Sequence, residues 1–161
     1  VFAIDRAGLV GEDGATHHGG FDLAFMRSIP NMVVSAPMDE KELRNMMFTA
    51  SKYTDGPFSI RYSKNRGLKK IEKEPFEPIP VGKGRKVKAG EKVAMITLGY
   101  AGVLAGKAIE KLEKENIFPG HFDMRFLKPL DQDLLAEAFS DYEHIITIED
   151  GTIKGGLSDA V

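Results

Sequence analysis

Short apolar runs alternate with segments of helical periodicity in the first half of the chain. The runs VFAID (1–5), MVVSA (32–36) and FSIRY (58–62) predict strands, the first of them buried. Glycine is dense between residues 6 and 20, which disfavours a regular element there. We therefore expect a long loop to leave the carboxyl end of the first strand.

Two helices are predicted between these strands. FDLAFMRSI (21–29) can form a short helix that Pro30 stops. Asp39 and Glu42 have the spacing of a capping box, and apolar side chains recur after them at i, i+3, i+4 and i+7. This apolar face consists of Leu43, Met46, Met47 and Ala50. We expect its methionines to pack in the core.

The second half repeats the alternation. GKGRKVK (82–88) and KVAMITLG (92–99) predict a hairpin across the AGE turn. HFDMRFL (121–127) predicts a further strand, and HIITIED (144–150) predicts a buried one. These strands are separated by segments whose apolar spacing is helical.

One helix is expected around residues 105–112, and another over 129–139 with Asp131 as its N-cap. Strands that alternate with helices are typical of an α/β fold with mostly parallel sheets, and we expect two such lobes. Ligands of such sheets bind beyond the carboxyl ends of strands. The glycine-dense loop after VFAID occupies such a position.

A change in composition separates the two halves. Residues 68–92 contain eight Lys or Arg and four Asp or Glu, and the prolines at 75, 78 and 80 disfavour a helix. A solvated, extended connector explains this charge better than a phosphate-binding strip does. We therefore divide the chain into a first domain (1–70), a linker (71–80) and a second, truncated domain (81–161).

The amino-acid composition excludes several classes of protein. Among 161 residues, 22 basic and 24 acidic side chains give a net charge of −2, which argues against a nucleic-acid binder. The absence of cysteine excludes disulfides, thiolate metal sites and cysteine nucleophiles. Because no apolar run approaches the ~20 residues of a membrane span and no leader is visible, we expect a cytoplasmic protein without membrane contact.

The chain starts within a strand and stops in an unfinished helix (155–161), so we also expect an internal segment of a longer polypeptide.

The glycine-dense loop holds the candidate chemistry. Arg6, Asp13 and His17 lie among its five glycines. Glycine lets the backbone approach a ligand closely, and arginine offers a planar fork for a phosphate or carboxylate. A histidine that titrates near neutrality can move a proton, with Asp13 near enough to share its pocket. These residues alone predict an anion-binding, acid–base loop, and a purely structural role for the Asp–His spacing is the alternative.

The order of the motifs carries a family resemblance. DRAG (5–8) precedes GEDGATH (11–17), which has the G-x-D-G-x-T-H pattern of transketolase-like enzymes, and Gly19 and FD (21–22) follow. Together they closely resemble the 1-deoxy-D-xylulose-5-phosphate synthases, a thiamine-diphosphate-dependent branch of those enzymes. The resemblance covers essentially the whole chain in the right order. Further matching segments are IPNMVVSAPMDEKEL (29–43), DGPFSIRY (55–62), VGKG (81–84), MRFLKPLD (124–131) and IEDGTIKGG (148–156).

The resemblance implies a partial pyrimidine-binding domain followed by a transketolase C-terminal domain. Such enzymes condense pyruvate with D-glyceraldehyde 3-phosphate and release carbon dioxide, which provides precursors of isoprenoids, thiamine and pyridoxal. The resemblance also implies a cytoplasmic homodimer that needs thiamine diphosphate and Mg²⁺. The main ligands of both belong to the family's N-terminal domain, so we expect the isolated segment to be inactive. No metal-ligand cluster is visible in the sequence itself.

Three residues of the loop receive roles through this resemblance. His17 lies beside the cofactor and the pyruvate-derived group, where it helps with proton transfer. Asp13 orients the substrate hydroxyls or His17. Arg6 binds the phosphate of the aldehyde, for which a bidentate cation is suited.

The second phosphate ligand is expected within RYSKNRG (61–67), which departs from the family's R-Y-P-R-G motif. Arg66 keeps its place beside the glycine, whereas Lys64 keeps the count from Arg61. We favour Arg66, because a guanidinium next to glycine can approach a phosphate closely.

Two other functions are compatible with parts of the pattern. The β-chain of a 2-oxo-acid dehydrogenase shares the C-terminal pattern, but DRAG with the trailing H-x-G-x-FD counts against it. A stand-alone assembly module of transketolase fold could use the positive connector for a partner. That function leaves the set of Arg6, Asp13 and His17 unexplained, so the synthase is favoured.

Overall fold

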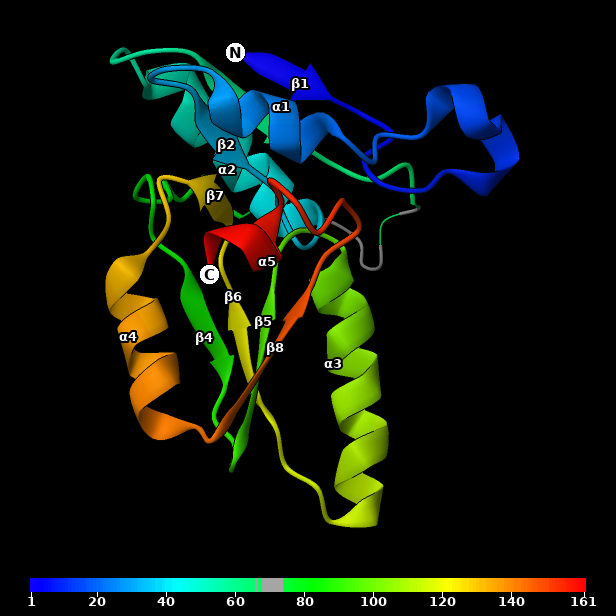
Figure 1. Ribbon diagram of the computed structural model, residues 1–161. Helices are drawn as coiled ribbons and strands as arrows, with labels where there is room; N and C mark the ends of the chain where they lie inside the picture. Colours follow the sequence, from blue (N-terminus) through cyan, green and yellow to red (C-terminus); the bar gives the residue numbers. More distant parts are fainter. Residues whose placement is uncertain (66, 68–73) are drawn as a thin grey trace.

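The computed structural model describes residues 1–65, 67 and 74–161, which form two α/β lobes, one above the other in Figure 1. Each lobe is built on one four-stranded sheet in which most neighbouring strands are parallel. The predicted fold class, α/β with two mostly parallel sheets, is therefore confirmed. None of the helices in the described part of the chain has the length and apolarity needed to cross a bilayer.

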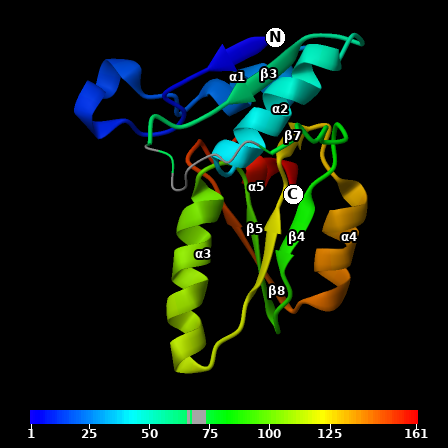
Figure 2. The ribbon, with the colours of Figure 1, turned by 180° about the vertical axis from the view of Figure 1, so that it is seen from behind.

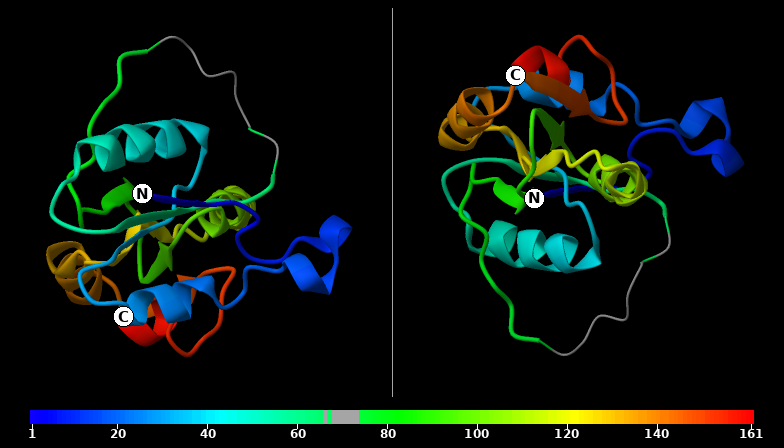
Figure 3. Two further views of the ribbon diagram at one scale, coloured as in Figure 1. Left: turned by 90° about the horizontal axis from the view of Figure 1, so that it is seen from above. Right: turned by 90° about the horizontal axis from the view of Figure 1, so that it is seen from below.

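The first sheet has the order β1, β3, β2, β7, with β7 antiparallel to β2 and the other pairs parallel. Its strands span Phe2–Ile4 (β1), Val33–Ser35 (β2), Phe58–Arg61 (β3) and Phe126–Lys128 (β7). Figure 3 shows α1 (Asp22–Ser28) and α2 (Glu40–Lys52) on opposite faces of this sheet. Successive residues of β2 accordingly point to different helices, Val33 to the core under α2 and Val34 to the core under α1.

The second sheet has the order β4, β6, β5, β8, with β4 antiparallel to β6 and the other pairs parallel. Its strands span Arg85–Lys88 (β4), Val93–Thr97 (β5), Gly120–Asp123 (β6) and His144–Ile148 (β8). The helices of this half are α3 (Ala101–Leu112), which the 3₁₀ turn η3 (Glu113–Glu115) extends, α4 (Gln132–Asp141) and α5 (Leu157–Ala160). Figures 1 and 2 show α3 and α4 flanking the sheet.

The hairpin predicted for residues 82–99 is wrong. β6 lies between β4 and β5 and pairs with both. All four residues of β6 are buried, whereas β4 is largely exposed and carries an arginine and two lysines. A strand that is buried on both faces belongs inside a sheet, and a charged strand suits its edge. Burial, and not the short AGE turn, therefore decides the strand order.

The single strand predicted for residues 121–127 is divided between the sheets. β6 ends at Asp123, and β7 begins at Phe126 in the other lobe. The chain turns at Arg125, whose φ is +57°, and the amide of Arg125 donates to Asp123 Oδ1 at 3.2 Å. The turn lets Phe126 pack against Phe58 in the first lobe, with ring centroids 6.3 Å apart.

Two strands predicted to be buried lie at sheet edges. Within the described residues, β1 pairs with β3 alone and β8 with β5 alone. Phe2 of β1 and Ile146 of β8 are both among the exposed large apolar residues. A run of a few apolar residues does not distinguish a central strand from an edge strand, because both have one face against the core.

The proline-containing segment 74–80 lies along α2 instead of running free in solvent. The amide of Ile79 donates to Thr49 Oγ1 at 2.8 Å, and the Ile79 side chain is buried in the first lobe. Residues 71–73 of the predicted linker lie outside the described residues. The described part of the connector is thus anchored by side chains of a helix, which its charge pattern did not indicate.

Both predicted N-caps are formed. Asp39 accepts a hydrogen bond from the amide of Glu42 at 2.9 Å, and Asp131 accepts one from the amide of Leu134 at 3.2 Å. The side chain of Glu42 does not complete the capping box, because it binds two arginines instead. These caps show that the starts of α2 and α4 are encoded locally.

Glu42 belongs to a charged cluster between the lobes. Its carboxylate accepts hydrogen bonds from Arg125 at 2.7 and 2.8 Å and from Arg85 at 2.8 Å. Arg85 also pairs with Asp123 at 3.1 Å, and Asp123 is fully buried. Burial raises the pKa of Asp123 to about 6, although Arg85 acts against this shift. The cluster ties α2 of the first lobe to β4 and β6 of the second.

Candidate active site

The glycine-dense loop leaves β1 and returns to α1, and it projects from the side of the first lobe (Figure 1). Gly8 and Gly19 form its neck, where each donates a backbone hydrogen bond to the other, at 3.3 and 2.9 Å. Two 3₁₀ turns, η1 (Gly11–Asp13) and η2 (Ala15–His17), make up the projecting part. The neck needs glycine at position 8, where φ is +73° and a Cβ would lie 2.1 Å from Asp150 Oδ2.

Arg6 and Asp13 meet at the base of this loop. Arg6 Nε donates to Asp13 Oδ2 at 2.7 Å, and Arg6 also pairs with Asp5. Lys64, which follows β3, donates to the other oxygen of Asp13 at 2.5 Å. The hydrogen bonds from Lys64 and Arg6 lower the pKa of Asp13, and the bond to Asp13 raises the pKa of both cations. Asp13 is therefore a carboxylate at neutral pH that holds two cations together.

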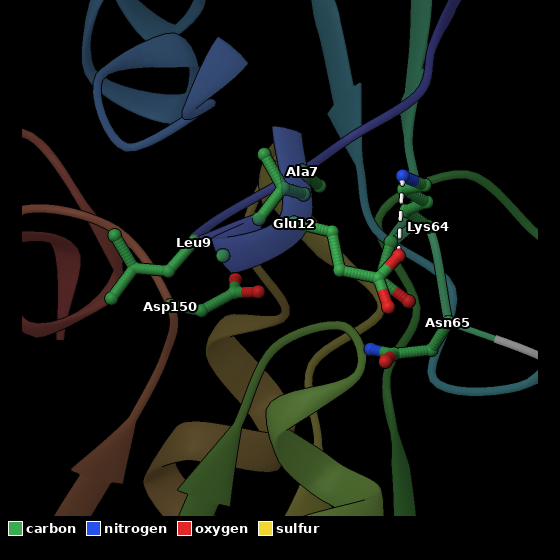
Figure 4. Close-up of a pocket in the computed structure, with 9 residues that line it drawn as sticks. Ala7, Leu9, Glu12, Lys64, Asn65 and Asp150 are labelled. Atoms are coloured by element: carbon green, nitrogen blue, oxygen red, sulfur yellow. Dashed lines mark ion pairs between the residues drawn. The ribbon is translucent and has the colours of Figure 1, made fainter. Parts of the chain in front are cut away.

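An open pocket of about 570 Å³ lies beside this cluster, at the carboxyl ends of β1, β3 and β8. Figure 4 shows Lys64 and Asn65 on one side of Glu12, and Leu9 and Asp150 on the other, with Lys64 and Glu12 paired at 3.7 Å. The lining consists of Ala7, Leu9, Val10, Gly11, Glu12, Ser63, Lys64, Asn65 and Asp150. The pocket thus joins the glycine loop to the segment after β8, in the region where a ligand was expected.

His17 lies apart from the other predicted residues. It is exposed at the end of η2, and its Nδ1 lies 3.0 Å from Thr16 Oγ1. It does not line the pocket formed by the described residues. The structure therefore brings Arg6 and Asp13 together and adds Lys64. Arg66, the favoured second phosphate ligand, lies outside the described residues.

Arg61 is a central residue of the site, although its sequence motif assigned it no role of its own. It lies at the end of β3, and its side chain is 2% exposed. Nε bonds both oxygens of Asp22 at 2.8 Å, Nη1 bonds Asp150 Oδ1 at 2.7 Å, and Nη2 bonds the carbonyl oxygens of Gly19 and Asp150. Burial opposes the charge, but Asp150 and Asp22 outweigh it, so the pKa of Arg61 is raised. An arginine at the end of a strand that is expected to be buried was the available signal, because a buried charge requires partners.

The charged side chains around the pocket determine which of the groups implied by the family resemblance can bind there. Among the residues that the structure describes, no group of three or more histidine or carboxylate side chains is arranged to hold a metal ion. The acidic residues around the pocket are themselves engaged with cations: Glu12 and Asp13 with Lys64, and Asp150 with Arg61. These acidic side chains do not fit a diphosphate–magnesium group, whereas Arg6 and Lys64, which meet at Asp13 beside the pocket, suit a small phosphorylated ligand.

The family model of the transketolase pyrimidine-binding domain matches residues 1–68, and that of the transketolase C-terminal domain matches residues 82–161. The chain therefore belongs to the transketolase family.

Its curated relatives carry one specific name. The 1-deoxy-D-xylulose-5-phosphate synthase of Bacteroides fragilis is 56% identical over 162 residues, covering 100% of this chain and 25% of the relative. The synthase of the same name from Cytophaga hutchinsonii is 51% identical, covering 100% of this chain and 26% of the relative. The chain thus spans about a quarter of these relatives' length. The resemblance to this synthase family is confirmed, and the 2-oxo-acid dehydrogenase alternative is not favoured.

Solved structures give the same fold. A chain described as a split-gene transketolase, inactive β4 tetramer, superposes with a TM-score of 0.84 at 34% identity, covering 98% of this chain and 50% of that one. A transketolase mutant from Pichia stipitis has a TM-score of 0.74 at 22% identity, covering 94% of this chain and 23% of that one. The second similarity concerns the fold alone.

Proposed function

We propose that this chain is the segment of a 1-deoxy-D-xylulose-5-phosphate synthase that receives the phosphorylated aldehyde. The complete enzyme condenses pyruvate with D-glyceraldehyde 3-phosphate and releases carbon dioxide. The observation that carries the proposal is the convergence of Arg6 and Lys64 on Asp13, beside an open pocket that Lys64 lines. A cation on the loop with the synthase motif and a second cation just after β3 suit a phosphate, and the relatives at about half identity are such synthases.

In this proposal Arg6 is the main phosphate ligand. Among the described residues, its bonds to Asp5 and Asp13 use Nη1 and Nε, which leaves Nη2 for a phosphate oxygen. Asp13 keeps the guanidinium in place and reaches the hydroxyls of the substrate. Arg66 remains our preferred second phosphate ligand, with Lys64 as the alternative. The bond from Lys64 to Asp13 supports a role for Lys64 in the same site.

His17 is proposed to move protons beside the cofactor. Its Nδ1 is engaged with Thr16, so Nε2 is the atom that exchanges a proton with the substrate. When bound, thiamine diphosphate supplies the decarboxylation and carbon–carbon bond chemistry. We place the main ligands of thiamine diphosphate and Mg²⁺ in other parts of the complete enzyme, as the family resemblance implies; among the described residues no group of three or more histidine or carboxylate side chains is arranged to hold the metal ion.

The remaining expectations from the family resemblance also stay proposals. We divide the chain into a partial pyrimidine-binding domain (1–70), a linker (71–80) and a truncated C-terminal domain (81–161). The two family models, which match 1–68 and 82–161, support this division. We propose that the complete enzyme is a cytoplasmic homodimer.

The test compares two aldehydes in the complete enzyme. Arg6→Ala should raise the KM for D-glyceraldehyde 3-phosphate by about 10- to 100-fold, the range for losing a charge-assisted hydrogen bond. The KM for unphosphorylated glyceraldehyde should hardly change. Arg27→Ala, which removes a half-buried arginine paired with Asp159, is the matched control. An Arg6→Ala enzyme that treats both aldehydes alike would contradict the phosphate role.

His17→Ala should behave differently. A group that transfers protons affects both aldehydes, so kcat should fall by about 10²- to 10⁴-fold with either one. His144→Ala, at an exposed position on β8, is the control. If both His17→Ala and Arg6→Ala lose activity equally on the two aldehydes and melt earlier than wild type, the two residues only brace the loop.

A further inference from the structure

Arg61 connects four separate segments of the chain at one buried point. Its own strand β3, the first residue of α1, the neck of the glycine loop and the segment after β8 all meet at the guanidinium. One cation therefore serves two carboxylates, Asp22 and Asp150, and a backbone carbonyl, that of Gly19. A planar fork with several donors can satisfy these acceptors together, whereas a lysine ammonium cannot reach all of them.

The neck of the loop is packed between the two carboxylates that Arg61 holds. A Cβ on Gly8 would lie 2.1 Å from Asp150 Oδ2, and a Cβ on Gly19 would lie 3.1 Å from Asp22 Oδ2. The same Cβ on Gly19 would lie 2.8 Å from the carbonyl oxygen of Arg6. Because these approaches leave no free space, a shift of either carboxylate shifts the neck.

Both sides of the candidate pocket depend on this packing. On the loop side, Ala7 and Leu9 line the pocket next to Gly8, and Arg6 lies two residues before Gly8, so its backbone is tied to the neck. Asp150 lines the pocket from the opposite side, where Nη1 of Arg61 fixes its Oδ1 and Nη2 binds its carbonyl oxygen. The distance between the loop and the segment after β8 is therefore set by a residue that does not itself line the pocket.

We infer that Arg61 is a positioning residue of the proposed synthase, which holds the glycine loop and Asp150 at the spacing that phosphate recognition by Arg6 requires. The inference rests on the proposed function and deepens it, because it names what determines the geometry of the phosphate site. Arg61 touches neither the substrate nor the cofactor in this role. Its effect reaches the substrate through Gly19, Asp150 and the backbone around Arg6.

The first experiment measures the neck without using activity. Hydrogen–deuterium exchange of the complete enzyme should show the amides of Gly8 and Gly19 exchanging at least about tenfold faster in Arg61→Lys than in wild type. Exchange in α3 should not change. Arg27→Lys is the matched control, because the pair of Arg27 with Asp159 also joins α1 to the last helix but does not touch the neck. Equal exchange at the neck in Arg61→Lys and Arg27→Lys would overturn the inference.

The second experiment measures the consequence for the substrate. In Arg61→Lys the KM for D-glyceraldehyde 3-phosphate should rise by up to about 10²-fold, the range for a misplaced binding group, while the KM for pyruvate should change less than about twofold. With unphosphorylated glyceraldehyde as the acceptor, Arg61→Lys should not raise the KM for the aldehyde. A purely structural role predicts instead an equal loss with every substrate together with a lower melting temperature, and that result would overturn the inference.

Asp150→Asn provides an independent variant if Arg61→Lys does not fold. Asparagine retains an acceptor for Nη1 and leaves the pair of Arg61 with Asp22 intact, so a smaller change in the same two measurements is expected. Unchanged neck exchange in Asp150→Asn would count against the inference. A wild-type enzyme that does not condense pyruvate with the aldehyde would refute the proposed function, and the exchange experiment would still decide the role of Arg61 at the neck.

Discussion

Replacing Asp123 by asparagine should remove part of the pH dependence of folding. Asp123 is fully buried at the end of β6, where Arg85, Arg125 and Glu42 face it. Burial raises its pKa from 3.8 to about 6, because the two arginines only partly offset burial and the repulsion from Glu42. Between these two values the folded chain binds a proton that the unfolded chain has released. The contribution of Asp123 to stability is therefore greatest at low pH and falls as pH rises towards about 6.

The magnitude follows from the separation of the two pKa values. About two pH units, at about 1.4 kcal/mol per unit, correspond to about 3 kcal/mol in total. Linkage places about 2 kcal/mol of this between pH 4.5 and 7. The free energy of unfolding of wild type, minus that of Asp123→Asn, should fall by about this amount over the interval, because asparagine has nearly the same shape and does not titrate.

Urea titrations at several pH values, followed by circular dichroism, measure this difference without screening the ion pairs. Asp131→Asn is the matched control in the same lobe. Burial acts to raise the pKa of Asp131, but the hydrogen bonds from Leu134, Lys83 and Gly84 outweigh it, so the pKa is lowered. The contribution of Asp131 to the free energy of unfolding is therefore fully present above its ordinary pKa of 3.8. It is lost only as the pH falls below that value. The difference between wild type and the control should be flat between pH 4.5 and 7.

The result that would refute this reasoning is a difference for Asp123→Asn that stays constant or increases over the same interval. Either outcome would mean that Arg85 and Arg125 compensate the burial of Asp123 completely. The pair with Arg85 at 3.1 Å would then be the dominant influence on the carboxyl group.

Three further predictions concern the loop, the connector and the activity. Gly8→Ala should destabilise the chain by more than about 1 kcal/mol in urea titrations, because φ is +73° and the new Cβ meets Asp150, whereas Gly11→Ala, which meets nothing within 4 Å, should cost less. Thr49→Val should cost about 1–3 kcal/mol in the same assay, since it leaves the buried amide of Ile79 without its acceptor; a loss below 0.5 kcal/mol, on the order of a neutral surface change, would contradict this. The 161-residue chain alone, incubated with pyruvate, D-glyceraldehyde 3-phosphate, thiamine diphosphate and Mg²⁺, should release carbon dioxide only at background; turnover above background would refute that expectation.

The candidate site was predictable where its residues are close in sequence. Arg6 and Asp13 lie in one glycine-rich loop, and the structure pairs them at 2.7 Å. His17 belongs to the same motif, yet it lies at the exposed end of η2, away from that pair. Arg61 and Asp150 are 89 positions apart, so no local pattern could predict their contact. Their pairing arises because β3 and β8, in different sheets, end at the same place.

The sequence by itself determined where α2 and α4 begin and the class of the fold. Asp39 and Asp131 act on amides three residues away, and such contacts form wherever the chain is helical. The alternation of strands with helices likewise follows from the period of the apolar positions.

Only the tertiary structure decided the neighbours of each strand and the partners of each buried charge. The fully buried β6 separates β4 from β5, although the two are close in sequence, and Arg125 with its positive φ directs the next strand into the other sheet. Glu42, predicted as half of a capping box, binds Arg85 and Arg125 instead. The physical reason is the same in each case: burial is a property of the whole packed molecule, and it selects contacts between residues whose separation in sequence carries no signal.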